Sequence, residues 1–222
     1  MAKNHITLFY DVVSPFTYMG LECLGKLKTY YNADITLEPF FLGGIMETTG
    51  NKPPAAVPNK GAYMKLDLIR YAAITGVPHK HPSMFPAFTL PTQRLLRVIK
   101  AQEPDRLHEA SLALARAYFV EDRDIGQPAV MVSALEFLGK GRVQQWLDVD
   151  CKSPKIKEEL VAVTKRAMEN GCFGSPWWEV KRGRDGKEDK YFGCDRFEHM
   201  AEFLEVPYPG LRAFTEYPKS KL

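Results

Sequence analysis

The sequence contains little cysteine, and its four cysteines are scattered along the chain. They are Cys23, Cys151, Cys172 and Cys194, in a sequence of 222 residues. None lies within three residues of another, which excludes a Cys-x-x-Cys redox pair and the paired cysteine spacing of a zinc site. We therefore expect a reduced intracellular protein without disulfide bonds.

A long apolar run and a strong net charge are also missing. No apolar run approaches the length of a membrane span, and residues 1–6 are too short and too polar for a signal peptide. Thirty Lys and Arg against 27 Asp and Glu leave a net charge of +3, too small to indicate nucleic acid as the main partner. We expect a soluble globular protein of one large or two small domains, with no membrane span.

No complete metal-binding motif is present either. The segment His79-Lys80-His81 lacks a carboxylate or cysteine nearby that would complete a site. The spacings of Cys172, Cys194 and His199 fit no common zinc arrangement. We expect residues 79–81 to form a solvated loop before Pro82, and no metal site.

The first forty residues predict a strand, a helix and a second strand. Residues 5–10 are β-branched or aromatic and stop at Asp11. A helix is expected to begin at Ser14 and Pro15, because Ser is a preferred N-cap and Pro suits the first helical position. Residues 35–42 form the next predicted strand. This βαβ order favours a parallel strand pair.

The middle of the chain reads as a loop followed by helices only. Residues 43–60 are rich in Gly, Pro, Asn and Thr, so we expect them to be irregular. The predicted helices lie near residues 64–73, 92–101, 105–120, 127–139 and 153–170. A helical block of this length between two α/β pieces indicates an insertion domain.

A second α/β piece follows Gly171. Residues 177–180 and 190–192 flank a turn at residues 182–186 and read as a hairpin, followed by a helix over 194–204. The predicted fold class is therefore α/β. Its order matches a thioredoxin-like fold over residues 1–62 and 171–212, with an all-helical insertion domain over 63–170 and a tail over 213–222.

The predicted junctions between strands and helices contain the polar residues that could carry chemistry. Ser14 caps a helix whose positive dipole end meets a loop edge, although a cap alone explains a Ser there. Ser175-Pro176 is either an ordinary trans turn or the cis-proline that this strand order predicts. Asp195 is either a helix cap or a group that binds a ligand amine.

These segments, taken together, resemble a kappa-class glutathione transferase. That class lies in the DsbA-like branch of the thioredoxin superfamily and is related to the 2-hydroxychromene-2-carboxylate isomerases. The resemblance covers nearly the whole chain, in family order. The segments that carry it are Phe9-Tyr10-Asp11-Val12-Val13-Ser14-Pro15-Phe16, Gly44-Ile45-Met46, Gly50-Asn51-Lys52-Pro53-Pro54, Lys60-Gly61-Ala62-Tyr63-Met64, Phe173-Gly174-Ser175-Pro176 and Phe192-Gly193-Cys194-Asp195-Arg196.

The resemblance implies that glutathione binds as a co-substrate and assigns residues to its sulfur end. Ser14 is then the residue that contacts the sulfur, and Pro15 and Phe16 line that contact. Ser175, before the expected cis-Pro176, pairs with the cysteinyl backbone.

The same resemblance assigns residues to the two other ends of the tripeptide. Asn51 and Lys60 lie near the glycyl end, and Cys194 with Asp195 holds the γ-glutamyl end. The family usually has Ser where Cys194 stands and often Leu where Ser175 stands. A thiol is a weaker hydrogen-bond donor than a hydroxyl, so the Cys194 position bears mainly on glutathione affinity.

Ser14 can account for thiol activation on energetic grounds. Lowering a thiol pKa of about 8.5 by about two units requires roughly 2.7 kcal/mol in favour of the thiolate. A hydrogen bond from the Ser14 hydroxyl to a charged sulfur contributes about 1.5–3 kcal/mol, and a helix N-terminus about 0.3–2 kcal/mol. We therefore expect a transferase in which glutathione attacks a small hydrophobic electrophile, as in detoxification.

Other functions remain open at this point. Glutathione-dependent isomerisation and peroxide reduction would use the same site, and a non-catalytic thioredoxin-like module is a further alternative. Ser14 and Thr17 stand where a disulfide oxidoreductase has its cysteine pair, which argues against that activity. The family resemblance also favours a homodimer.

The last three residues, Ser220-Lys221-Leu222, match a peroxisomal address. Such a signal is read by an import receptor at the extreme C-terminus, and the prolines before it predict an irregular, accessible tail. We expect a peroxisomal protein of eukaryotic origin, with the cytoplasm or mitochondrion as the alternative.

Overall fold

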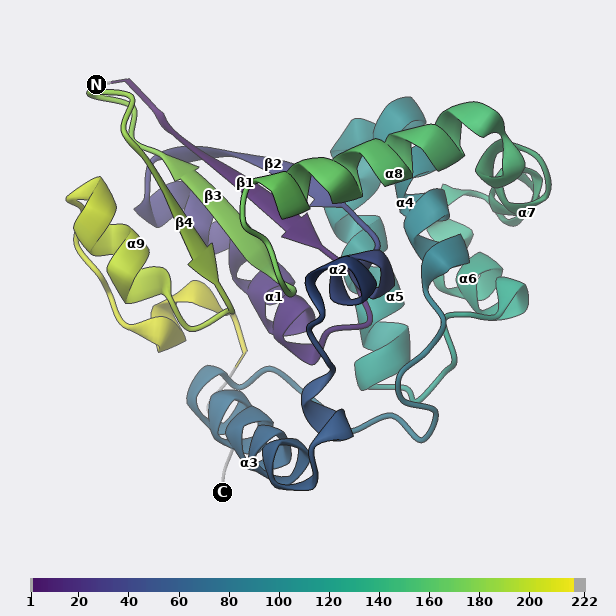
Figure 1. Ribbon diagram of the computed structural model, residues 1–222, viewed down its shortest axis with the longest axis horizontal. Coiled ribbons are helices and arrows are strands. Elements are labelled where there is room, and N and C mark those ends of the chain that lie inside the picture. Colours follow the sequence, from purple (N-terminus) through teal and green to yellow (C-terminus); the bar gives the residue numbers. More distant parts are fainter. Residues whose placement is uncertain (1, 218–222) are drawn as a thin grey trace.

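A four-stranded mixed sheet lies at the centre of the computed structural model, which describes residues 2–217 (Figure 1). The strand order is β2-β1-β3-β4. Strands β1 and β2 are parallel, whereas β3 pairs antiparallel with both β1 and β4. The predicted parallel βαβ unit and the predicted hairpin are confirmed. The strands are β1 (Asn4–Tyr10), β2 (Ala33–Pro39), β3 (Trp177–Lys181) and β4 (Glu188–Phe192).

Helices flank the sheet and extend beyond one of its ends. Figure 1 shows α4 to α8 gathered on one side of the molecule, whereas α3 lies apart from them, toward the C-terminal segment. Among residues 2–217, no helix is long and apolar enough to cross a membrane. The helices are α1 (Pro15–Tyr30), α2 (Leu42–Thr49), α3 (Pro58–Thr75), α4 (Leu90–Gln102), α5 (Leu107–Phe119), α6 (Pro128–Ala134), α7 (Lys140–Asp148), α8 (Pro154–Glu169) and α9 (Phe197–Leu204).

The two faces of the sheet are buried in two separate apolar clusters. Because side chains alternate along a strand, Ile6 and Leu8 of β1 point into the larger cluster, which includes residues of α1, α5 and α9. Phe9 points the other way, into a smaller cluster with residues of α2 and α8. The larger cluster runs without interruption from the sheet into the helical block. The C-terminal end of β1 therefore lies where the sheet and the helical block meet.

The prediction of an irregular segment over residues 43–60 is wrong at both of its ends, where α2 covers residues 42–49 and α3 begins at Pro58. The second strand ends at Pro39 rather than at Leu42, and α2 follows immediately. The first backbone N–H of α2, on Leu42, donates to the Asp11 carboxylate at 3.0 Å, and α2 buries Leu42 and Ile45. These long-range contacts outweigh the helix-breaking composition of the segment. Helix α2 then ends at its C-cap, Gly50, which has the left-handed conformation.

Most predicted helices are present with shifted ends. Helix α3 begins at Pro58, upstream of the predicted boundary between residues 62 and 63, and α9 begins at Phe197 rather than Cys194. The prediction missed α7, whose only buried residues are Val143, Trp146 and Leu147. Their i, i+3, i+4 spacing is helical, but it covers little more than one turn, which is too short for a periodic pattern to stand out.

Candidate functional site

Ser14 lies at the junction where β1 ends and α1 begins. Its backbone is extended, with φ −83° and ψ 123°, and its Oγ accepts a hydrogen bond from the Thr17 N–H at 3.3 Å. Pro15 occupies the first helical position. The Ser14 hydroxyl therefore lies at the positive end of the α1 dipole, as the sequence predicted.

A second segment, 161 residues away in sequence, meets Ser14 at this point. The Ser14 Oγ donates to the Ser175 carbonyl oxygen at 2.9 Å, and the Thr17 and Ser175 hydroxyls lie 2.7 Å apart. The Ser175–Pro176 peptide bond is cis, as predicted. Ser14 thus has a buried carbonyl partner that no local pattern in the sequence indicates.

Asp11 holds the site together, although the sequence reasoning gave it no role. Its side chain is fully buried, and each carboxylate oxygen accepts two hydrogen bonds. The donors are Val13 N–H at 3.1 Å, Leu42 N–H at 3.0 Å, Thr89 Oγ1 at 3.0 Å and Gln93 Nε2 at 2.8 Å. The carboxylate therefore joins the Ser14 loop to α2 and to the start of α4.

Burial raises the pKa of the Asp11 carboxyl above its usual value, and the hydrogen bonds it accepts oppose that rise. The same residue also acts through its backbone. Its N–H donates to Ser175 Oγ at 3.0 Å, and its carbonyl accepts from the Ser14 N–H at 3.1 Å. The signal that sequence reasoning passed over is an acidic residue at the end of an apolar strand.

Ser14 opens onto a cavity of about 840 Å³. The walls come from the α1 N-terminus, α2, the loop before α3, α3 itself, the segment before α4 and the two loops around β3 and β4. The lining is mainly apolar, with a few charged side chains at the rim. The residues that line it include Val13, Ser14, Pro15, Phe16, Phe41, Leu42, Met46, Asn51, Lys52, Lys60, Asp67, Arg70, Tyr71, Phe85, Pro86, Phe88, Ser175, Cys194, Asp195 and Arg196.

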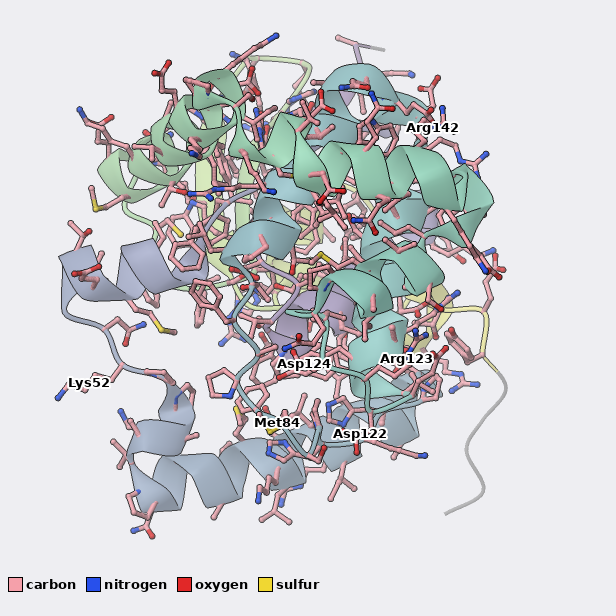
Figure 2. All side chains as sticks on the ribbon, turned by 90° about the vertical axis from the view of Figure 1, so that its right-hand side faces the viewer. Lys52, Met84, Asp122, Arg123, Asp124 and Arg142 are labelled. Carbon is pink, nitrogen blue, oxygen red and sulfur yellow. The ribbon has the colours of Figure 1, made fainter. Side chains whose placement is uncertain are left out.

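One wall of this cavity was not anticipated from the sequence. It is the segment before α4, which includes Phe85, Pro86 and Phe88, with a second cis peptide bond at Phe85–Pro86. The Ser83 N–H donates to the Asp122 carboxylate at 2.7 Å, and Figure 2 shows Met84 close to the loop that bears Asp122. The wall is therefore attached to the loop after α5.

The loop predicted to lie near one end of the ligand closes another side of the cavity. Asn51 Nδ2 donates to the Phe173 carbonyl at 2.7 Å, which ties this loop to the segment before Ser175. Lys60 lies on the first turn of α3 and lines the same cavity. The neighbouring Lys52 projects away from the body of the protein (Figure 2).

The side chain of Cys194 lies in the core although the residue lines the cavity. It is 1% exposed, and the Tyr71 hydroxyl donates to its carbonyl at 3.2 Å. Burial raises the pKa of the Cys194 thiol well above its usual value. Asp195 is exposed, and its carboxylate pairs with Arg196 at 2.8 Å. This segment therefore presents backbone and a carboxylate to the cavity, and no thiolate.

The other three cysteines are buried as well, and no disulfide joins the four cysteines within the described chain. Burial raises the pKa of each of the Cys23, Cys151 and Cys172 thiols to about 12. All four are neutral thiols at neutral pH, so none is a ready nucleophile. Among residues 2–217, no group of three His, Cys, Asp or Glu side chains is placed to bind a metal ion.

The structure brings most of the predicted binding residues together. Eight of the nine line the one cavity; the exception is Pro176, which lies behind Ser175 at the start of β3. Ser220, Lys221 and Leu222 lie outside the described residues. The expected homodimer stays a prediction.

Comparison with known proteins places the chain in a family. The sequence model of the DSBA-like thioredoxin domain matches residues 5–205. Glutathione S-transferase kappa 1 of Homo sapiens is 32% identical over 211 residues, which span 92% of each chain. The chain belongs to the kappa-class glutathione transferases.

Two further comparisons bear on this kappa-class chain. A 2-hydroxychromene-2-carboxylate isomerase from Pseudomonas putida is 29% identical over 82 residues, 36% of this chain and 40% of the relative. A solved structure of a 2-hydroxychromene-2-carboxylate isomerase superposes with a TM-score of 0.73 at 20% identity, over 90% of this chain and 94% of that chain. The second likeness shows the shared fold, and the predicted thioredoxin-like architecture with a DsbA-like helical insertion is confirmed.

Proposed function

We propose that this kappa-class enzyme binds glutathione in the 840 Å³ cavity, with the glutathione sulfur at Ser14, and transfers the glutathione to a hydrophobic electrophile. The observation that carries the proposal is the buried Ser14 hydroxyl at the α1 N-terminus, on the wall of that cavity. The full-length similarity to kappa-class relatives supports glutathione as the co-substrate.

The Ser14–Ser175 hydrogen bond suggests how the ligand enters. In the structure, the Ser14 hydroxyl donates to the Ser175 carbonyl at 2.9 Å. The cysteinyl N–H of glutathione would replace Ser14 as the donor to that carbonyl. The Ser14 hydroxyl, which rotates freely about its C–O bond, would then turn to donate to the sulfur. No buried carbonyl loses its partner in this exchange.

The site would then stabilise the thiolate without a cation. The hydroxyl donor and the α1 N-terminus both favour negative charge on the sulfur. Their combined contribution of about 2–5 kcal/mol is of the size of the roughly 2.7 kcal/mol needed to lower the thiol pKa by two units. The attacking sulfur comes with glutathione, because the protein's own thiols are buried and neutral.

The second substrate would lie against the apolar part of the cavity. Phe41, Phe85 and Phe88 line this part, and Phe41 and Phe88 meet edge to face at 6.5 Å between ring centroids. Aromatic walls of this kind favour a hydrophobic electrophile close to the sulfur.

The test is the Ser14→Ala variant. Loss of the hydroxyl donor should lower turnover with glutathione and 1-chloro-2,4-dinitrobenzene by about tenfold to a hundredfold, while calorimetry still detects glutathione binding. The absorbance of bound thiolate near 240 nm should show the thiol pKa rising in the variant. Unchanged turnover would contradict the assignment of Ser14.

Isomerisation is a second candidate, supported by the similarity to the Pseudomonas putida isomerase over 82 residues. The glutathione thiol would add to the substrate and then leave, so Ser14 would have the same role. Parallel assays with 2-hydroxychromene-2-carboxylate and with cumene hydroperoxide would compare isomerisation and peroxide reduction with conjugation.

For the location of the enzyme we propose peroxisomal import through Ser220-Lys221-Leu222. A fluorescent fusion that ends in this tripeptide should collect in peroxisomes, and removal of the three residues should leave it in the cytosol. Import that persists after the deletion would contradict the proposal.

A further inference from the structure

A second, smaller groove lies on the far side of Phe41 from the main cavity. It has a volume of about 280 Å³ and lies between α2, the start of α4 and α8. Phe41 is the residue that the linings of the groove and the main cavity share. The lining residues are Phe41, Gly44, Thr48, Leu90, Arg94, Lys157, Leu160, Val161, Thr164, Lys165 and Met168.

The charged side chains of the groove are all of one sign. Arg94 comes from α4, and Lys157 and Lys165 come from α8. None of the described residues that line the groove is acidic. Lys165 has one ion-pair partner, Glu169, at 3.6 Å between two exposed side chains, which is a weak interaction. The groove therefore carries an excess of positive charge.

Arg94 gives a further indication of a ligand. Its Nε is buried, and it has no hydrogen-bond partner among residues 2–217. This atom is closed off from the groove, so a ligand would pair with the guanidinium group as a whole. Neither Arg94 nor Lys157 forms an ion pair with a carboxylate among residues 2–217, so both charges lack a counter-charge that an anion in the groove would supply. The two hydroxyls of the groove already donate elsewhere, Thr48 to Gly44 O at 2.9 Å and Thr164 to Leu160 O at 2.7 Å.

The floor of the groove is apolar. Phe41, Leu90, Leu160, Val161 and Met168 supply it, and Val161 is 67% exposed. A small inorganic anion would leave this floor open to water. A volume of about 280 Å³ is that of about nine water molecules at about 30 Å³ each. With one carbon atom in place of each water, the groove has room for a chain of about eight to ten carbon atoms.

We propose that this groove binds the anion of a medium-chain fatty acid, with the carboxylate at Arg94 and Lys157 and the chain along the apolar floor toward Lys165. The bound chain lies against Phe41, whose other side lines the main cavity. Phe41 is closely packed, since a Cβ built on Gly43 would lie 2.6 Å from its ring. A ligand in the groove is therefore in a position to alter the electrophile wall of the main cavity.

Direct calorimetric titration of the full chain with decanoate tests the proposal. Decanoate should bind at least tenfold more tightly than neutral decanol, because the alcohol cannot pair with the cations. It should also bind several-fold more tightly than octanoate, since each buried methylene is worth up to about fourfold in affinity. Equal affinity for decanoate and decanol would overturn the proposal.

The location of the bound chain is tested with the double variant Arg94→Gln, Lys157→Gln. Its affinity for decanoate should fall at least tenfold. The matched control is Lys155→Gln, an exposed lysine on the same helix that does not line the groove, and its affinity should stay within twofold of the wild type. Unchanged binding in the double variant would assign decanoate to the main cavity or to non-specific association, and the groove site would be rejected.

This result does not depend on the proposed glutathione chemistry, because the readout is decanoate binding. Where glutathione also binds, saturating glutathione should leave decanoate binding within a few-fold. Full displacement of decanoate by glutathione would place both ligands in the main cavity and contradict a separate site.

Discussion

The sequence pattern Asp-x-x-Ser-Pro occurs twice in the chain, at residues 11–15 and 150–154. Both copies start a helix, α1 and α8, with an extended Ser at the N-cap and Pro at the first helical position. In both, the Ser Oγ accepts from the third helical N–H at 3.3 Å, and the Ser N–H donates to the Asp carbonyl, at 3.1 Å and 3.0 Å. Locally, the two segments are nearly equivalent.

The two copies differ in the partners of their side chains. Ser153 donates back to the carbonyl of Asp150 in its own segment, at 2.7 Å, whereas Ser14 donates to Ser175 across 161 residues. Asp11 is fully buried with four donors, whereas the Asp150 carboxylate accepts one exposed hydrogen bond from Gln102. The same local pattern is a plain helix start in one place and forms part of the cavity wall in the other.

The largest predicted difference is in stability between the variants Asp11→Ala and Asp150→Ala. Asp11→Ala leaves four donors without their acceptor, at about 1–3 kcal/mol for each buried group, so the free energy of unfolding should fall by about 3 kcal/mol or more. Asp150→Ala should lower it by less than about 1 kcal/mol. Urea unfolding followed by circular dichroism measures both.

Asp11→Asn offers a milder version of the same change if Asp11→Ala does not fold. The amide keeps one acceptor oxygen, and Gln93 can turn its own oxygen, which is unpartnered among the described residues, toward the new NH₂. Its loss of stability should lie between those of Asp11→Ala and the wild type. Equal stability of Asp11→Ala and Asp150→Ala would remove the distinction between the two segments.

Smaller effects on stability are expected from Ser14→Ala and Ser153→Ala. Each variant loses one N-cap, which costs about 1 kcal/mol, and Ser14→Ala also leaves the buried Ser175 carbonyl without its donor, so its free energy of unfolding should fall further than that of Ser153→Ala. Turnover should fall only in Ser14→Ala, which makes Ser153→Ala the matched control for the activity test. If Ser153→Ala lost activity as strongly, the loss in Ser14→Ala would reflect the missing cap and not the sulfur contact.

The smallest effect is a pH dependence that belongs to Asp11. Its pKa is raised in the folded protein, so between the ordinary value of 3.8 and the raised value the folded state binds more protons than the unfolded state. Stability from this group is therefore present at low pH and is lost as the pH rises. Asp11→Asn lacks this contribution, so the stability that the variant loses relative to the wild type should become smaller as the pH rises above 3.8, by at most about 1.4 kcal/mol per unit of pKa shift. A constant deficit over this range would show that Asp11 does not titrate there.

Sequence reasoning worked best where short-range rules decide the structure. The Ser14 and Ser153 helix starts, the parallel βαβ unit and the hairpin after Pro176 follow from capping, β propensity and turn residues. It failed at α2, because the helix depends on Asp11 at one end and on packing against α8. Neither contact is visible in the residues of α2 themselves.

The same division applies to the site. Motif resemblance selected Ser14, Asn51, Lys60, Ser175 and Asp195, and the fold brings them to one cavity. It could not select the Phe85–Phe88 wall or the groove beside Phe41, since these surfaces exist only where separate elements meet.

By itself, the sequence determined the starts of α1 and α8, the parallel βαβ unit and the absence of a cysteine pair at residues 14–17, because these depend on residues that are close in the chain. Only the tertiary structure decided that Ser14, and not Ser153, faces a cavity. The reason is that Asp11 and Ser175 come from the end of one central strand and the start of its neighbour. Their hydrogen bonds are formed when the sheet closes, and they hold the Ser14 helix start against the wall of the cavity.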